Sequence, residues 1–463
     1  MRTDYLGNPV SVTSDAALAA VDDFIAGFLA YETRAANILA AADGAPAEPL
    51  LNAYAAVLWL LLEAPDAAAR AAPYLERARA SLDGANERER KVVAFVSAWS
   101  ADDIPGALSV ANAILEAWPR DLLMLKLRQY HDFNRGDFPA MLRAASRCLT
   151  AAGDIPQLHG MLAFAYEQCH LLEEAEAAAR HALSLQRKEP WAQHALAHVM
   201  LTQGRIDEGV AFLEGVRDTW TDLNSFMDTH LWWHLALFYL SQGRFQAALA
   251  AYDEHCWTQS RDYSQDQIGA VSLLARLELA GVDVGARWND LAGYLANRAG
   301  DVVQPFLSLQ YLLGLARAGR PEADQLLAAI RRAALEAPDF VRPTWRDVAL
   351  PAAEGLVAHL RGDYPTALLG LRSALPRMAE VGGSHAQRDL FDQIVLDALI
   401  RSDRLSEAQQ MLELRRSLDP DGLPINQALA DLYERLDLPV QAAVARERVA
   451  RRREGHASRG SRP

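Results

Sequence analysis

Lysine is nearly absent from this chain of 463 residues. Only Lys91, Lys126 and Lys188 carry an ammonium group, so arginine supplies almost all of the positive charge. The net charge of −14 leaves no strong basic field, which argues against nucleic acid or an anionic membrane as a partner. The arginine-rich run near the C-terminus is therefore interpreted as a solvated helix end rather than an RNA-binding tail.

Cysteine and long apolar runs are also scarce. Cys148, Cys169 and Cys256 are widely spaced and form no C-x-x-C pair, which argues against a disulfide framework and is typical of a reducing compartment. The first residues lack the apolar core of a signal peptide. The longest apolar stretch, residues 53–62, is too short to span a bilayer. The sequence predicts a cytoplasmic protein without a membrane partner.

Sustained alternation of apolar and polar residues is absent, whereas apolar residues recur with helical spacing almost everywhere. Short breaks such as Gly204-Arg-Ile206 and Gly243-Arg-Phe245 are typical of a glycine that ends one helix before the next begins. A small residue follows five positions after each glycine, where the two helices of a hairpin come closest. The chain is therefore predicted to consist of helical hairpins.

The spacing of these hairpins indicates tetratricopeptide-like repeats. Ala163 and Ala197 are 34 residues apart, which is the period of that repeat, and Ala197 and Ala236 are 39 residues apart. We predict an all-α, right-handed superhelical solenoid of such hairpins. We expect one continuous repeat array over residues 1–453 and a flexible C-terminal tail at 454–463.

Histidines are concentrated in one part of the chain. Nine of the twelve lie between His131 and His255. They include two pairs with i, i+4 spacing, which places both rings of a pair on one helix face. In tetratricopeptide arrays the first helix of each repeat lines the concave groove. Counting along adjacent repeats places the following residues there: Trp191, His194, His198, His230 and Trp233, with His234 beside them.

Imidazole is the commonest transition-metal ligand and the usual general base near neutral pH. Histidines from neighbouring helices can build a metal site within a helical bundle. Three interpretations stay open: hydrogen-bonded histidines stacked on tryptophan, a ligand or catalytic pocket without metal, and a divalent metal site. The candidates for catalysis and for metal binding are His194, His198, His230 and His234. The chain has no H-E-x-x-H, so a zincin mechanism is not supported.

A second group of polar residues follows Gly382 and Gly383. Ser384 and Gln387 have the spacing of a capping box and predict a helix start at that serine. Arg388 then lies in the first turn, where backbone N–H groups can hold an anion, so we include it as a ligand-binding candidate. Phosphate-binding glycine loops and a G-x-S-x-G elbow are absent from the sequence.

Several segments resemble one known family over nearly the whole chain. They are Asp4-Tyr-Leu-Gly-Asn-Pro-Val-Ser11, Trp191-x-x-His194-x-x-x-His198, His230-x-x-Trp233-His234, Val284-Gly-Ala-Arg-Trp288 and Gly382-Gly-Ser384-x-Ala-Gln-Arg388-Asp389. The chain is similar to the tetratricopeptide repeat protein 38 family. The resemblance implies a helical-repeat protein without an appended enzyme domain, and it implies that the His/Trp segments belong to the family.

Two functions compete on the sequence alone. The first is a binding protein that holds a small molecule or peptide in a His/Trp-lined concave groove. A clamp for a peptide carboxylate would use groove lysines, and only Lys126 fits that position. The alternative is an enzyme that acts on a small polar substrate at the four histidines, with a divalent metal as the candidate cofactor.

The groove interpretation carries an expectation about stability. Exposed side chains change stability by less than about 0.5 kcal/mol when they are replaced. We therefore expect that replacing His198 and His230 together by alanine leaves the melting temperature nearly unchanged while abolishing ligand or metal binding. A much lower melting temperature would contradict the exposed placement.

Overall fold

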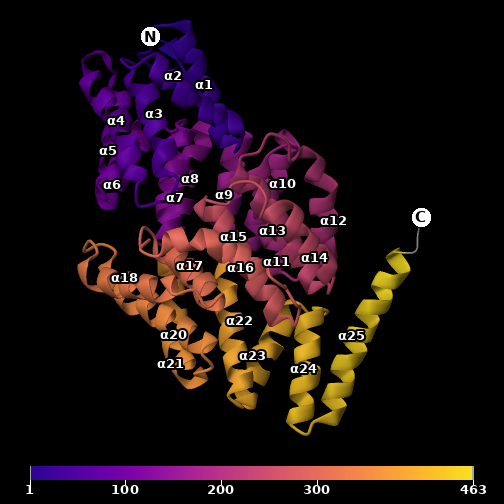
Figure 1. The fold of residues 1–463 in the computed structure, drawn as a ribbon. Helices are drawn as coiled ribbons and strands as arrows, with labels where there is room; N and C mark the ends of the chain where they lie inside the picture. The colour runs from indigo at the N-terminus through magenta and orange to yellow at the C-terminus, as the bar shows by residue number, and fades with distance from the viewer. Residues whose placement is uncertain (1, 461–463) are drawn as a thin grey trace. The chain divides into compact units, whose positions relative to one another are not determined.

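The structure is a computed structural model that describes residues 2–460, with side chains described up to residue 454 (Figure 1). It divides into two compact units, residues 1–196 with 218–227 and residues 197–217 with 228–463. The division passes through two helices, α11 (Pro190–Thr202) and α13 (Ser225–Ser241), each of which is continuous. The predicted tail at 454–463 falls partly outside the described residues and stays a prediction.

The first unit is built from consecutive helices that begin after a short N-terminal hairpin. Its remaining elements are β1 (Arg2–Thr3), β2 (Pro9–Val10), α1 (Asp15–Leu29), η1 (Thr33–Ala36), α2 (Asn37–Gly44), α3 (Pro49–Leu60), α4 (Ala67–Ala80), η2 (Leu82–Gly84), α5 (Glu87–Ser100), α6 (Ile104–Ala117), α7 (Leu122–Asn134), α8 (Phe138–Ala152), α9 (Pro156–Gln168), α10 (Leu172–Leu185) and η3 (Arg217–Thr219).

The described residues of the second unit form helices joined by loops. Its elements are α12 (Ile206–Val216), α14 (Phe245–Ala251), η4 (Tyr252–Cys256), α15 (Ser264–Leu279), α16 (Arg287–Leu295), η5 (Ala296–Arg298), α17 (Pro305–Arg317), α18 (Glu322–Glu336), α19 (Arg342–Thr344), η6 (Trp345–Ala349), α20 (Leu350–Leu360), α21 (Tyr364–Ala374), η7 (Leu375–Val381), α22 (His385–Arg401), α23 (Leu405–Leu418), α24 (Leu423–Arg435) and α25 (Pro439–Gly460).

The predicted all-α helical-repeat fold is confirmed. Gly204 and Gly243 adopt positive φ angles of 66° and 74° where one helix ends and the next begins, as the glycine-punctuated pattern predicted. The capping box of Ser384 and Gln387 also forms at the start of α22. An antiparallel pair, β1–β2, was not predicted; it is closed by a turn in which the Asp4 carboxylate accepts backbone N–H groups. None of the helices in residues 2–460 combines the length and apolar character needed to cross a bilayer.

Contacts far apart in the sequence join the two ends of the second unit. Ser241, at the end of α13, donates a hydrogen bond to the Asp419 carboxylate after α23. Arg452 on α25 pairs with Asp207 on α12 at 2.6 Å. Helical repeats ordinarily contact only their sequence neighbours. In this unit the last helices instead form hydrogen bonds and an ion pair with the first ones.

The close packing of α12 against α13 in the second unit requires a glycine at position 209. A Cβ atom added at Gly209 would lie 2.3 Å from the ring of Phe238 on α13, which is fully buried. Ala197 and Ala236 are likewise fully buried at the small positions of the repeat. Small residues therefore set how closely these helices pack, as the tetratricopeptide pattern predicted.

This contact predicts that Gly209→Ala destabilises the protein by about 1–3 kcal/mol, because the added methyl overpacks a buried aromatic ring. Gly215→Ala is the matched control on the same helix, since its added Cβ meets nothing within 4 Å. The control should be neutral or stabilising by up to about 1 kcal/mol, because alanine favours the helix. Urea unfolding of both variants measures the difference, and equal midpoints would contradict the packing.

Candidate metal centre

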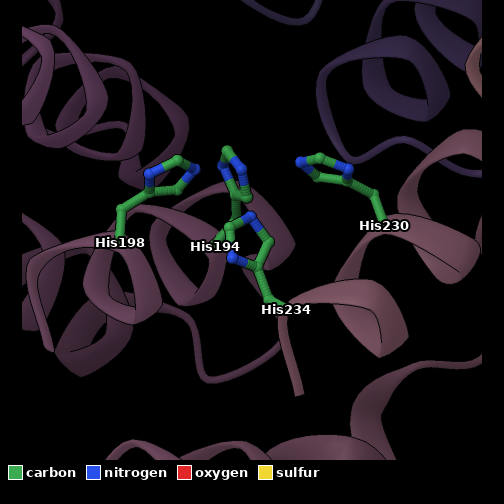
Figure 2. Close-up of side chains that lie close together, drawn as sticks. All are labelled: His194, His198, His230 and His234. Carbon is green, nitrogen blue, oxygen red and sulfur yellow. The ribbon is translucent and has the colours of Figure 1, made fainter. Parts of the chain in front are cut away.

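Four histidines on two helices form one group, which we call the histidine cluster. His194 and His198 lie one turn apart on α11, and His230 and His234 lie one turn apart on α13. One ring nitrogen from each histidine lies within 4.8 Å of those of the other three. Figure 2 shows the four rings turned toward a common centre. The structure thus brings together all four of the predicted metal-binding candidates.

The rings of the histidine cluster pack directly on one another. The centroids of His198 and His234 are 4.4 Å apart, and those of His230 and His234 are 4.8 Å apart with the rings nearly perpendicular. These contacts lie within the second unit. His194 precedes His198 by one turn of the same continuous helix, so α11 itself fixes their relation.

The cluster is buried, and the expectation of exposed groove imidazoles was wrong. His194 and His198 are each 1% exposed and His234 is fully buried, whereas His230 is half-buried. Removing such a ring leaves a cavity and strips packing from its neighbours, so an unchanged melting temperature is not expected for the variant lacking His198 and His230.

Tryptophan rings support the cluster on both helices. His194 stacks on Trp191 with centroids 4.4 Å apart. His230 stacks on Trp233 at 5.3 Å, with the two rings nearly parallel. Trp233 is itself buried, whereas Trp191 is half-buried. Each predicted tryptophan therefore contacts a histidine of the cluster, and the stacking restricts the orientation of that ring.

Desolvation also fixes the charge state of His230, the half-buried histidine of the cluster. Desolvation, with a smaller effect from neighbouring His198, lowers the pKa of His230 to about 3. This ring is therefore neutral at physiological pH. A neutral imidazole keeps the nitrogen lone pair that binds a metal, so a metal does not compete with a proton at this ring.

Arg276 is a site neighbour that the sequence analysis missed. Its guanidinium lies 5.6 Å from the ring of Trp233 and donates hydrogen bonds to Ser272 and to the carbonyl of Ala386. Burial lowers its pKa to about 10, although nearby Asp389 opposes that shift. Arg276 thus connects α15 and the start of α22 to the tryptophan that supports His230. The available signal was an arginine within the otherwise apolar segment 273–277.

Arg388 and Lys126 are used elsewhere in the fold. Arg388 donates to the carbonyl of Gly383 and to Nδ1 of His385 at 3.3 Å, so it secures the loop before α22. Lys126 donates to the carbonyls of Phe28 and Leu29, both at 3.0 Å, and so caps the C-terminal end of α1. A peptide-carboxylate clamp built on Lys126 is therefore not supported.

Comparisons with known proteins show a distant similarity in fold and nothing more specific. No family model matches the chain. Human IFIT1 dimer with PPP-AAAA is similar over 95% of both chains, at 12% identity and a TM-score of 0.43. Rap protein complexed with competence and sporulation factor is similar over 88% of this chain and 99% of that one, at 10% identity and a TM-score of 0.36. The P58(IPK) TPR domain is similar over 81% of this chain and all of that one, at 12% identity and a TM-score of 0.20. Likenesses this distant transfer no ligand or partner to this chain.

The lowered pKa of His230 predicts that the metal-free protein loses stability as the pH falls from about 6.5 to about 3. In that window the unfolded state binds a proton at this ring and the folded state does not. One such group contributes a slope of up to about 1.4 kcal/mol per pH unit. Urea midpoints from pH 7 to pH 4, measured with a chelator present, should show a shallower slope for His230→Phe.

The exposed residue His181 supplies the control for this pH series. His181→Gln should retain the full pH dependence of the parent protein. Equal slopes for the parent and His230→Phe would show that His230 is not held neutral by burial.

Proposed function

We propose that this chain is a tetratricopeptide-type protein that binds one divalent transition-metal ion through the histidine cluster and presents that ion to a ligand. The observation that carries the proposal is the convergence of four imidazole nitrogens, from two helices, to within 4.8 Å of one another. Side chains that served packing alone would not require four titratable rings at one point.

The ligand set selects the class of metal. Imidazole suits zinc, copper, iron and nickel, whereas calcium and magnesium take oxygen ligands. Within the part of the chain that the structure describes, the group contains four histidines and no carboxylate. Zinc–nitrogen bonds of 2.0–2.1 Å place tetrahedral ligand nitrogens about 3.3 Å apart. The observed limit of 4.8 Å is close enough for small ring rotations to complete that geometry.

The resemblance to the tetratricopeptide repeat protein 38 family supports the same site. Both histidine pairs and both tryptophans fall within the segments that carry the resemblance. We infer that the chain belongs to that family and that the histidine cluster is a family feature. This inference places the metal within the repeat array itself, where tetratricopeptide proteins hold their ligands.

An enzyme acting on a small polar substrate is the second candidate, and the uneven burial of the cluster favours it. Structural zinc sites have four protein ligands, whereas catalytic sites have three and keep one open position. His230 is half-buried, while the other three histidines are buried. Exchange of His230 for water or substrate would leave a three-histidine metal site with an open position.

Metal analysis tests the proposal directly. Protein stripped with a chelator and reloaded with Zn²⁺ or Co²⁺ should hold one ion per chain, measured by elemental analysis after desalting. His198→Gln and His234→Gln should each weaken metal affinity at least about tenfold, equivalent to about 1.4 kcal/mol, because each removes a ligand. A competing chromophoric chelator reports the affinity.

Glutamine is chosen because it nearly preserves side-chain size and polarity, so the variants should fold. His181→Gln, which changes an exposed histidine outside the cluster, should bind the metal as tightly as the parent. If both cluster variants retained full affinity, or if the parent held no metal, the proposed function would be wrong.

A further inference from the structure

The Trp233 indole contacts two of the four histidines in the cluster. It stacks on His230 with the ring centroids 5.3 Å apart and the two planes 7° from parallel. The same indole meets the ring of His234 edge-on, with the centroids 4.9 Å apart. All three residues lie on α13 within the second unit. A tilt of Trp233 would therefore turn two of the proposed metal ligands at once.

The orientation of this indole does not come from a hydrogen bond. Trp233 is 1% exposed, and its Nε1–H has no acceptor among the residues that the structure describes. The N–H of a buried tryptophan usually finds a partner, which fixes the rotation of the ring. In this protein the contacts of the ring with its neighbours set its angle instead.

Arg276 on α15 supplies one of these contacts, and it also lies in the second unit. Its guanidinium carbon lies over the Trp233 ring, 5.6 Å from the centroid, where a cation is attracted to the aromatic system. The guanidinium donates to the hydroxyl of Ser272, one turn earlier on α15, and to the carbonyl of Ala386 in the first turn of α22. Two helices therefore fix the position of this charge beside Trp233.

A tie between α15 and α22 does not by itself require a charge at this position. Arg276 is 2% exposed, and among the described residues no carboxylate forms an ion pair with it. Asp389, which acts on it electrostatically, is paired with Arg415 at 2.6 Å. A buried charge without an ion pair is unfavourable, and a neutral donor could reach the same carbonyl without that cost. What the charge adds is its attraction for the Trp233 ring.

We propose that Arg276 is a positioning residue of the metal centre, which holds the Trp233 indole at the angle that directs His230 and His234 toward the ion. Arg276 acts through Trp233 and is not itself a ligand, because a guanidinium has no lone pair to offer a metal. The proposal rests on the proposed metal-binding function, and it adds a residue from a third helix to that site.

The test uses the full chain loaded with Co²⁺, whose visible spectrum reports the arrangement of its ligands. Arg276→Met keeps a long side chain and removes the charge. It should weaken Co²⁺ binding about tenfold, as the loss of an outer-shell partner of a ligand does, and it should shift the visible bands. Arg276→Lys keeps a cation beside the indole and should bind Co²⁺ within about threefold of the parent.

Arg298→Met is the matched control. Arg298 is also a buried arginine of the second unit, and its guanidinium lies 5.2 Å from the ring centroid of Tyr311, which is outside the cluster. This variant should lose stability, because the buried carboxylate of Asp301 loses its partner. It should nevertheless keep the cobalt affinity and spectrum of the parent. The control thus separates a loss of stability from a loss of ligand orientation.

Trp233→Phe tests the same contacts without changing Arg276, since a phenyl ring is smaller and attracts a cation less strongly than an indole. It should weaken Co²⁺ binding and shift the visible bands. Adding Arg276→Met to Trp233→Phe should weaken binding little further, because both changes interrupt one series of contacts.

The outcomes separate the two proposals. If the parent holds no cobalt, the metal function fails and the role of Arg276 fails with it. If the parent holds cobalt and Arg276→Met keeps its affinity and spectrum, only the positioning role is overturned. The same holds if Arg298→Met loses as much affinity as Arg276→Met. If Arg276→Met does not fold, Trp233→Phe decides, and parent-like affinity and spectrum in that variant overturn the role.

Discussion

The contact of His198 on α11 with His234 on α13 is the interaction on which the site depends. Two i, i+4 pairs on helices that face each other bring four imidazoles to one point, and neither helix could do so alone. Fully buried alanines, Ala197 and Ala236, occupy the small positions of the two helices. The small residues that the repeat requires at these positions also allow the histidine rings to meet, because bulky residues there would separate the two helices.

Burial then decides what His230 can do. Its desolvated ring stays neutral at physiological pH, which suits a metal and does not suit a surface that responds to pH near neutrality. Stacking on Trp191 and Trp233 restricts the ring orientations before any ion arrives. A preorganised set of ligands binds more tightly than a flexible one, because less conformational freedom is lost on binding.

The second unit departs from the usual independence of helical repeats. In an ordinary array each hairpin is stabilised by its sequence neighbours, and motions accumulate along the chain. Here the pairs Arg452–Asp207 and Ser241–Asp419 link residues far apart in sequence. These links involve α12, which follows α11 in the chain, and the end of α13, which carries two of the four histidines. The fold thereby restrains the part of the chain that holds the site.

The sequence by itself determined the helical hairpins, the glycine-ended helices, the capping box at Ser384 and the shared faces of the two histidine pairs. These features repeat within one or two helical turns, so local spacing encodes them. Sequence alone did not reveal the burial of the cluster or the approach of Arg276 to Trp233. Those features depend on contacts between residues distant in the chain, and only tertiary packing decides which face of a helix meets a neighbour and which meets water.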